Sequence, residues 1–302
     1  MSKIIHGFVT VVMGLCLVLY AAPVHAAAAA SKGTKNKDTA YALLRVITYG
    51  FTLQNSTNQV VKNVEFWTYA PATQTATQRC DRIETSHPCE VLKDDMGNQV
   101  LHFAMGDVAP SATKIVRIWA YLNVSITARP IKVTNYAPYL ACQKYIECDA
   151  PEIIRTARRL AAPSPFGTVK KIFAWTSDNI RYSGFSPNDR GAVYALEKQE
   201  GDCTEFSDLF VALCRANKIP ARCMSGYVYQ GQPGMEPSRY HDWAEFYHDG
   251  AWRMADPQQK VFMRDQADYI VMRISGCPVG NRVANFNRYR CSGEGIKVTM
   301  NG

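Results

Sequence analysis

The stretch Glu200-Gly201-Asp202-Cys203-Thr204-Glu205-Phe206 predicts a helix that begins with a cysteine. From here apolar residues recur at the spacing of one helix face: Phe206, Leu209, Phe210 and Leu213. Asp202 and Glu205 have the spacing of a capping box, so Asp202 is the expected N-cap and Cys203 the first helical residue. At that position free backbone N–H groups and the helix dipole favour the thiolate over the thiol, and the same N–H groups are placed to bind an oxyanion.

Cysteine counting sets Cys203 apart from the other cysteines. The chain has 10 cysteines, and Cys16 lies in an N-terminal segment that we expect to be removed, so an odd number remains. In an exported protein an odd number leaves at least one thiol outside a disulfide. Short separations predict three disulfides: Cys80–Cys89, Cys142–Cys148 and Cys277–Cys291. A pairing of Cys214 with Cys223 stays open, and spacing alone also allows Cys203 to be a disulfide or buried structural cysteine.

A reactive cysteine of this kind needs a histidine base and a third group that orients the histidine. Four histidines follow residue 26. His87 and His102 lie in a strand-rich half of the chain, and His248 precedes a predicted turn. His241 is therefore the candidate base.

The turn signal Asp249-Gly250 gives a geometric test of this choice. With a two-residue hairpin loop, Trp243 lies opposite Asp256 and His241 lies opposite Gln258. His241 and Asp256 are then diagonal neighbours on one face, and the carboxylate can fix the imidazole tautomer. A three-residue loop would put them on opposite faces, and both would then be ordinary strand-end residues.

The two halves of the chain differ in pattern. Four alternating apolar runs divided by polar turns predict strands, at 41–53, 60–69, 100–108 and 115–124. Helical spacing follows in four segments, at 151–162, 169–180, 192–199 and from residue 203. Asp149 is a candidate cap and Pro151 a first-turn residue of the first of these helices. We therefore predict an α+β protein with a β-sandwich domain at 39–128, a connection at 129–150 and a catalytic domain at 151–302.

The N-terminus has the pattern of a secretory signal peptide at 1–26. Lys3 precedes an apolar run from Phe8 to Tyr20, and small residues around Ala26 suit a signal peptidase. The run is short for a membrane span, and we expect a flexible leader at 27–38 and a secreted or periplasmic protein without an integral membrane segment. The formal net charge is +8, but the basic residues are dispersed, which argues against nucleic-acid binding. The chain has no C-x-x-C pair, so we expect no structural zinc site. We also expect no cofactor.

Several short motifs in the second half resemble the transglutaminase-like superfamily of papain-related cysteine enzymes. The resembling block runs from about residue 165 to 259. Its pieces are Gly201-Asp202-Cys203-Thr204-Glu205, Leu213-Cys214-Arg215-Ala216, Ile219-Pro220-Ala221-Arg222, Gly226-Tyr227, the run from His241-Asp242-Trp243 to Tyr247, and Trp252 through Asp256-Pro257. The resemblance implies a papain-like α+β core in which Cys203 is the nucleophile, His241 the base and Asp256 the orienting acid. Asp202 stands where animal transglutaminases carry Gln, and the chain is more similar to the bacterial branch, which often adds an Ig-like β domain before the core.

The resemblance leaves the reaction open, because the branch includes peptidases, amidases and cross-linkers. The leading hypothesis is an acyl-transfer enzyme on amide bonds of a protein or peptide, with hydrolysis favoured because water is abundant. The alternatives are a non-catalytic envelope binding or assembly module with the same fold, and a disulfide-stapled adhesion protein. The sequence leaves the oligomeric state open.

Overall fold

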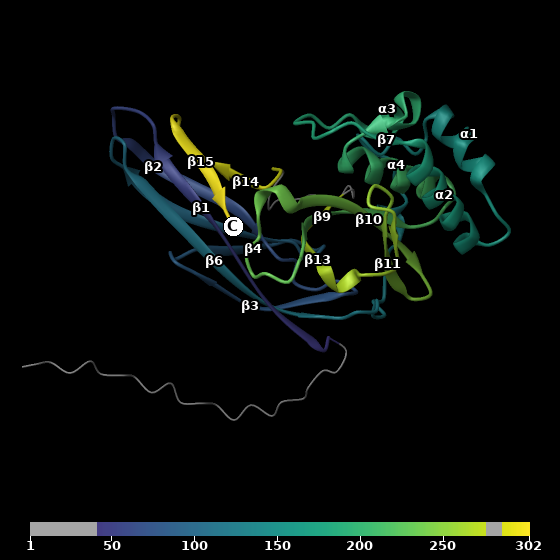
Figure 1. The fold of residues 1–302 in the computed structure, drawn as a ribbon, viewed down its shortest axis with the longest axis horizontal. Coiled ribbons are helices and arrows are strands. Elements are labelled where there is room, and N and C mark those ends of the chain that lie inside the picture. The colour runs from purple at the N-terminus through teal and green to yellow at the C-terminus, as the bar shows by residue number, and fades with distance from the viewer. Residues whose placement is uncertain (1–40, 276–285) are drawn as a thin grey trace, which may run out of the picture. The chain divides into compact units, whose positions relative to one another are not determined.

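The computed structural model describes residues 41–275 and 286–302, and its fold is α+β (Figure 1). The predicted signal peptide, the leader and Cys277 lie outside the described residues. Among the described residues, no helix is long and apolar enough to cross a membrane.

Two four-stranded antiparallel sheets form the first part of the fold, in the orders β15-β1-β6-β3 and β14-β2-β5-β4. Six of these strands lie in the first half of the chain: β1 (Leu43–Asn55), β2 (Val61–Ala70), β3 (Gln78–Thr85), β4 (Glu90–Lys93), β5 (Gln99–Val108) and β6 (Thr113–Val124). Their inward side chains share one apolar core, which makes the pair of sheets a sandwich. The four strands expected from apolar alternation are present, whereas the edge strands β3 and β4 carry many charged residues and show no alternation to detect.

The C-terminal strands belong to the sandwich. β14 (Tyr289–Cys291) pairs with β2, and β15 (Ile296–Asn301) pairs with β1 along six residue pairs. The expected domain boundaries assign these residues to the catalytic domain, so the pairing differs from that division. The physical reason is that β15 covers the free edge of the long strand β1, which would otherwise expose unpaired backbone groups.

The second part is a five-stranded antiparallel sheet in the order β12-β11-β10-β9-β13. Its strands are β9 (Ala221–Val228), β10 (Tyr240–His248), β11 (Ala251–Asp256), β12 (Val261–Phe262) and β13 (Tyr269–Ser275). The helices are α1 (Pro151–Leu160), α2 (Pro165–Asn179), α3 (Gly191–Lys198) and α4 (Cys203–Ala216), which agree with the four expected segments. α4 packs against β9 and β10, and its buried face shares an apolar core with the other helices (Figure 1). Pro151 is at the first position of α1 as expected, but the N-cap is Ala150 and not Asp149.

Polar side chains of the sandwich complete the edge of the five-stranded sheet. The buried Gln78 amide accepts from Val271 N–H at 2.8 Å and donates to Val271 C=O at 2.9 Å. Asn98 makes the same pair of bonds with Ile274, at 2.7 and 2.9 Å. The edge strand β13 therefore has its outer backbone groups paired by the sandwich instead of by another strand.

The disulfide predictions have mixed outcomes. Cys142–Cys148 is a disulfide, as expected. The predicted Cys80–Cys89 bond is wrong: both are free, half-buried thiols that pack against the sandwich core. Cys214 and Cys223 are both buried and free, and both pack in the apolar core around α4. Cys291 is free, and its expected partner lies outside the described residues.

Candidate active site

The start of α4 has the capping geometry that the sequence predicts. Asp202 is the N-cap, and its Oδ1 accepts from Thr204 N–H at 2.9 Å. Glu205 Oε2 accepts in return from Asp202 N–H at 2.9 Å. Gly201 is required for this arrangement, because a Cβ there would lie 2.4 Å from Glu205 Cβ. Cys203 is therefore fixed as the first residue of the helix.

The loop that contains Ser186 and Arg190 is hydrogen-bonded to the carboxylates of Asp202 and Glu205. Asp202 Oδ2 accepts from Ser186 N–H at 2.9 Å. The buried Glu205 carboxylate accepts from Arg190 N–H at 2.9 Å and from the Arg190 guanidinium at 2.6 Å. The cap of α4 therefore also holds the loop that precedes α3.

The β10–β11 hairpin has the two-residue loop on which the triad prediction depends. Asp249 and Gly250 both have positive φ, 47° and 73°, as a type I′ turn requires. His248 pairs with Ala251, and the register continues without a shift to the pair of Ala244 with Ala255. This is the register that places His241 and Asp256 diagonally on one face.

His241 and Asp256 are joined by a short hydrogen bond. His241 Nε2–H donates to Asp256 Oδ2 at 2.6 Å, and the Asp256 side chain is 0% exposed. Two further donors hold the carboxylate: Tyr269 OH reaches Oδ2 at 2.9 Å, and Gln259 N–H reaches Oδ1 at 3.0 Å. The buried carboxylate thus has a donor on both oxygens, and because a carboxylate only accepts, Nε2 is the His241 nitrogen that carries the shared proton.

Cys203 and His241 line one cavity of about 500 Å³, together with Tyr182, Tyr240 and Tyr269. Because Nε2 of His241 is bound to Asp256, Nδ1 is the nitrogen left to exchange a proton with the thiol. Gly226 lies opposite His241 on β9, and a Cβ at residue 226 would lie 1.9 Å from a backbone oxygen of β13. Glycine is needed here for the close approach of the strands that carry the site.

The Cys203 thiol donates to Asp242 Oδ2 at 3.7 Å, and within the described residues it has no hydrogen bond to His241. Burial and the Asp242 carboxylate raise the pKa of the Cys203 thiol. This corrects the expectation that the helix start alone favours the thiolate, because desolvation and a neighbouring negative charge oppose the helix dipole. A thiolate at this position needs a positive partner.

Residues 154–257 match the family described as "Transglutaminase-like superfamily". These residues form a transglutaminase-like domain. It contains all of α2, α3 and α4, which begins at Cys203, and the strands β10 and β11, which carry His241 and Asp256.

The fold is shared with a solved structure. The chain is similar to a protein from Cytophaga hutchinsonii described as a "Putative Cysteine Protease", at 18% identity and a TM-score of 0.57, over 86% of this chain and 92% of that one. It is also similar to the periplasmic domain of TgpA from Pseudomonas aeruginosa, at 14% identity and a TM-score of 0.38, over 68% and 90% of the two chains. The first likeness shows a shared fold, and the second is too distant to support an argument. No curated protein sequence matches this chain.

Two side chains contact the candidate site residues although the sequence does not predict these contacts: Tyr269 and Asp242. Tyr269 binds Asp256 from β13, which pairs with β9 far away in sequence, so no local pattern predicts the contact. Asp242 contacts the thiol although it follows His241 on the same strand. Strand β10 also contains Glu245 and two histidines, so the charge of Asp242 alone does not mark it as a partner of the thiol.

Proposed function

We propose that the protein is an exported cysteine enzyme that cleaves amide bonds of proteins or peptides by acyl transfer through Cys203, His241 and Asp256. The observation that carries this proposal is the 2.6 Å bond from His241 Nε2 to the fully buried Asp256, in a cavity that His241 shares with Cys203. The transglutaminase-like fold supports a cysteine-type enzyme.

The first half of the proposed reaction forms a thioester. His241 Nδ1 takes the proton of the Cys203 thiol, and Sγ attacks the carbonyl carbon of the amide. The Cys203 N–H, which has no partner within the helix and is not used by the Asp202 cap, stabilises the oxyanion. The C–N bond then breaks as the His241 imidazolium gives its proton to the leaving amine. Asp256 stabilises the imidazolium throughout this half of the reaction.

The second half releases the acyl group. His241 removes a proton from the acceptor, the acceptor oxygen or nitrogen attacks the thioester carbonyl, and the Sγ–C bond breaks. His241 returns the proton to Sγ, so the enzyme is regenerated. Water as acceptor gives hydrolysis and an amine gives cross-linking. We favour hydrolysis, because water outnumbers any amine around a surface cavity.

Export is part of the proposal. It rests on the signal-peptide pattern at 1–26 and on the Cys142–Cys148 disulfide, since disulfides persist in oxidising compartments. We therefore assign the protein to the periplasm or the cell exterior and expect a protein or peptide substrate there.

A second candidate is a non-catalytic envelope binding or assembly module that retains the transglutaminase-like fold. The contact that favours it is the hydrogen bond from the Cys203 thiol to Asp242, which holds the thiol protonated in the absence of ligand. This candidate predicts that Cys203 has the reactivity of an ordinary buried thiol and that His241 has no effect on it.

Alkylation kinetics separate the two candidates before a substrate is known. The folded protein is treated with iodoacetamide at neutral pH, and each cysteine is followed by peptide mass mapping. If the protein is the proposed enzyme, iodoacetamide labels Cys203 first, and this labelling is lost when His241 is replaced by Ala. Cys291→Ala, which removes another half-buried free thiol, is the matched control and leaves Cys203 labelling unchanged. Wild-type labelling of Cys203 in a folded His241→Ala protein would favour the binding module.

A further inference from the structure

A second cavity, of about 570 Å³, adjoins Cys203 on the side of Asp242. Thr204 and Asp242 both line it, and Asp242 Oδ2 accepts from Thr204 Oγ1 at 2.9 Å. His241 and Asp242 are consecutive residues of β10, so their side chains leave the strand in opposite directions. One strand thus supplies His241 to the first cavity and Asp242 to the second.

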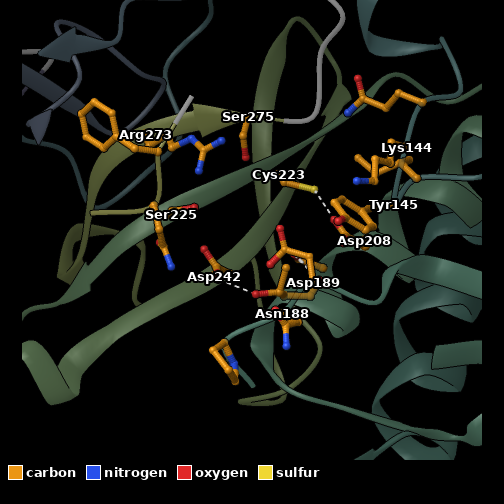
Figure 2. Close-up of a pocket in the computed structure, with 17 residues that line it drawn as sticks. Lys144, Tyr145, Asn188, Asp189, Asp208, Cys223, Ser225, Asp242, Arg273 and Ser275 are labelled. Atoms are coloured by element: carbon orange, nitrogen blue, oxygen red, sulfur yellow. Dashed lines mark hydrogen bonds between the residues drawn. The ribbon is translucent and has the colours of Figure 1, made fainter. Parts of the chain in front are cut away.

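Three carboxylates converge on this second cavity: Asp189, Asp208 and Asp242 (Figure 2). None of them has an ion-pair partner in the part of the chain that the structure describes. Lys144 also lines the cavity, but its ammonium lies over the Tyr145 ring at 4.6 Å. Arg273, on the opposite wall, lies 5.8 Å from the ring of Tyr69. Both cations act on Asp189 through space, but among the described residues neither forms an ion pair with any of the three carboxylates.

Asp208 is the most deeply placed of the three. It is 6% exposed, and its Oδ1 accepts only from the weak Cys223 thiol donor, at 3.4 Å (Figure 2). Its Oδ2 makes no hydrogen bond within the described residues. Burial and the nearby carboxylates, Asp189 among them, raise the pKa of Asp208. A buried carboxyl group with an unused oxygen facing a polar cavity is costly to the fold unless a ligand compensates it.

We propose that this acidic cavity binds a positively charged side chain of the amide substrate, an ammonium or a guanidinium, beside Cys203. The proposal rests on the proposed function and specifies its substrate class. The carboxylates hold the ammonium in its protonated form, which is not nucleophilic, so the bound group is a recognition element and not the acceptor amine. Asp189 lies exposed at the rim of the cavity, whereas Asp208 lies at its base.

Occupation of the cavity also acts on the nucleophile. Asp242 accepts the hydrogen bond of the Cys203 thiol and also lines the second cavity. Of the charged groups around the thiol, it raises the pKa of Cys203 most. The other groups around the thiol are Asp202 at the helix cap, Tyr182 and His241. A cation that pairs with Asp242 offsets its charge and favours the thiolate–imidazolium pair. Asp242 is in this sense a positioning residue that couples substrate charge to the state of the thiol.

Binding of small probes tests the cavity. The full mature chain is titrated with Nα-acetyl-lysine methylamide and, separately, with Nα-acetyl-norleucine methylamide, which has a similar aliphatic chain without the ammonium. We expect saturable binding of the lysine probe, and about tenfold weaker binding after Asp189→Asn or Asp242→Asn, since each removes a charged hydrogen-bond partner. Asp178→Asn, an equal charge loss in an exposed ion pair with Lys260, is the matched control and leaves binding unchanged.

Labelling kinetics test the coupling. The lysine probe should accelerate alkylation of Cys203 in the wild type. Asp242→Asn should label about tenfold faster than the wild type without the probe and gain nothing from it, because the opposing charge is already gone. A merely structural Asp242 would change neither the basal rate nor its dependence on the probe in this way.

Two results would overturn the inference: equal binding of the lysine and norleucine probes, or unchanged affinity for the lysine probe in both cavity variants. Failure of the proposed function has a different signature, since it appears as wild-type Cys203 labelling in the His241→Ala variant whether or not the lysine probe binds.

Discussion

Replacing Asp256 by Asn removes the negative charge of the third member of the proposed triad while keeping the size of its side chain. The carboxylate accepts three hydrogen bonds, from His241 at 2.6 Å, Tyr269 at 2.9 Å and Gln259 at 3.0 Å. An amide has one oxygen for these donors, so its NH₂ group must face at least one of them. Because Gln259 N–H and Tyr269 OH remain in place, the fold should survive, but the imidazolium loses its counter-charge.

The magnitude follows from the value of a hydrogen bond to a charged partner, about 2 kcal/mol. If that stabilisation of the imidazolium is lost, the thiolate–imidazolium pair becomes roughly 30-fold less populated. Alkylation of Cys203 at neutral pH should slow by that factor. The loss is smaller than the ~10⁴-fold effect of the comparable change in a serine triad, because a thiol is more acidic than a serine hydroxyl.

Tyr269→Phe is the matched control, since it removes one donor to Asp256 Oδ2 and keeps the carboxylate. It should slow labelling by less than about fivefold, the loss of one hydrogen bond of about 1 kcal/mol. The assay is the second-order rate of iodoacetamide labelling at Cys203, with folding of each variant checked by circular dichroism. Wild-type rates for Asp256→Asn would refute the assignment of Asp256, and equal losses in both variants would show that packing and not charge is responsible.

Four further predictions concern single residues. Cys203→Ala should abolish amide turnover and His241→Ala should reduce it nearly as far, with a double variant no worse than Cys203→Ala, as measured on an identified substrate. Burial raises the pKa of Cys214, so the unfolded thiol ionises first as pH rises. The free energy of unfolding should therefore fall above about pH 8.5, by up to about 1.4 kcal/mol per pH unit from this thiol. Cys214→Ala should remove that part of the decrease, as measured by denaturant titration at several pH values. Asp208→Asn should raise the free energy of unfolding at pH 7 by about 1 kcal/mol and weaken the lysine probe, and a destabilised variant would contradict a cost of the buried carboxyl group. Gly226→Ala should cost about 3 kcal/mol or prevent folding, because its Cβ would collide with the backbone of β13; a normal melting temperature would contradict this.

The local parts of the site are predictable from the sequence. The capping box at Asp202 and Glu205 and the turn at Asp249-Gly250 each depend on residues within a few positions of one another. Both have the expected geometry, and the hairpin register then places His241 against Asp256. Short-range rules suffice wherever one turn or one helix end sets the geometry.

The long-range parts of the fold are not predictable in this way. β15 returns to the edge of β1 from the other end of the chain, and Tyr269 reaches Asp256 from a strand that is not a neighbour in sequence. The prediction that Cys203 is a thiolate fails for the same reason. The helix start is a local feature, whereas the tertiary fold brings the opposing Asp242 carboxylate from β10 to the thiol. Electrostatics at a site depends on every charge within reach, and the sequence does not say which charges those are.

If Cys203 is the nucleophile we propose, the neighbouring positions of His241 and Asp242 on β10 explain how a thiol with a raised pKa can still react. Without substrate, the Cys203 thiol donates to Asp242 and stays protonated, and a protonated thiol reacts slowly with oxidants. In an exported protein this is an advantage, because the surroundings are oxidising. A substrate cation in the acidic cavity pairs with Asp242, and the thiol proton is then free to move to His241, whose imidazolium Asp256 already stabilises. The same contact that opposes ionisation in the free protein thus makes ionisation depend on the charge of the substrate.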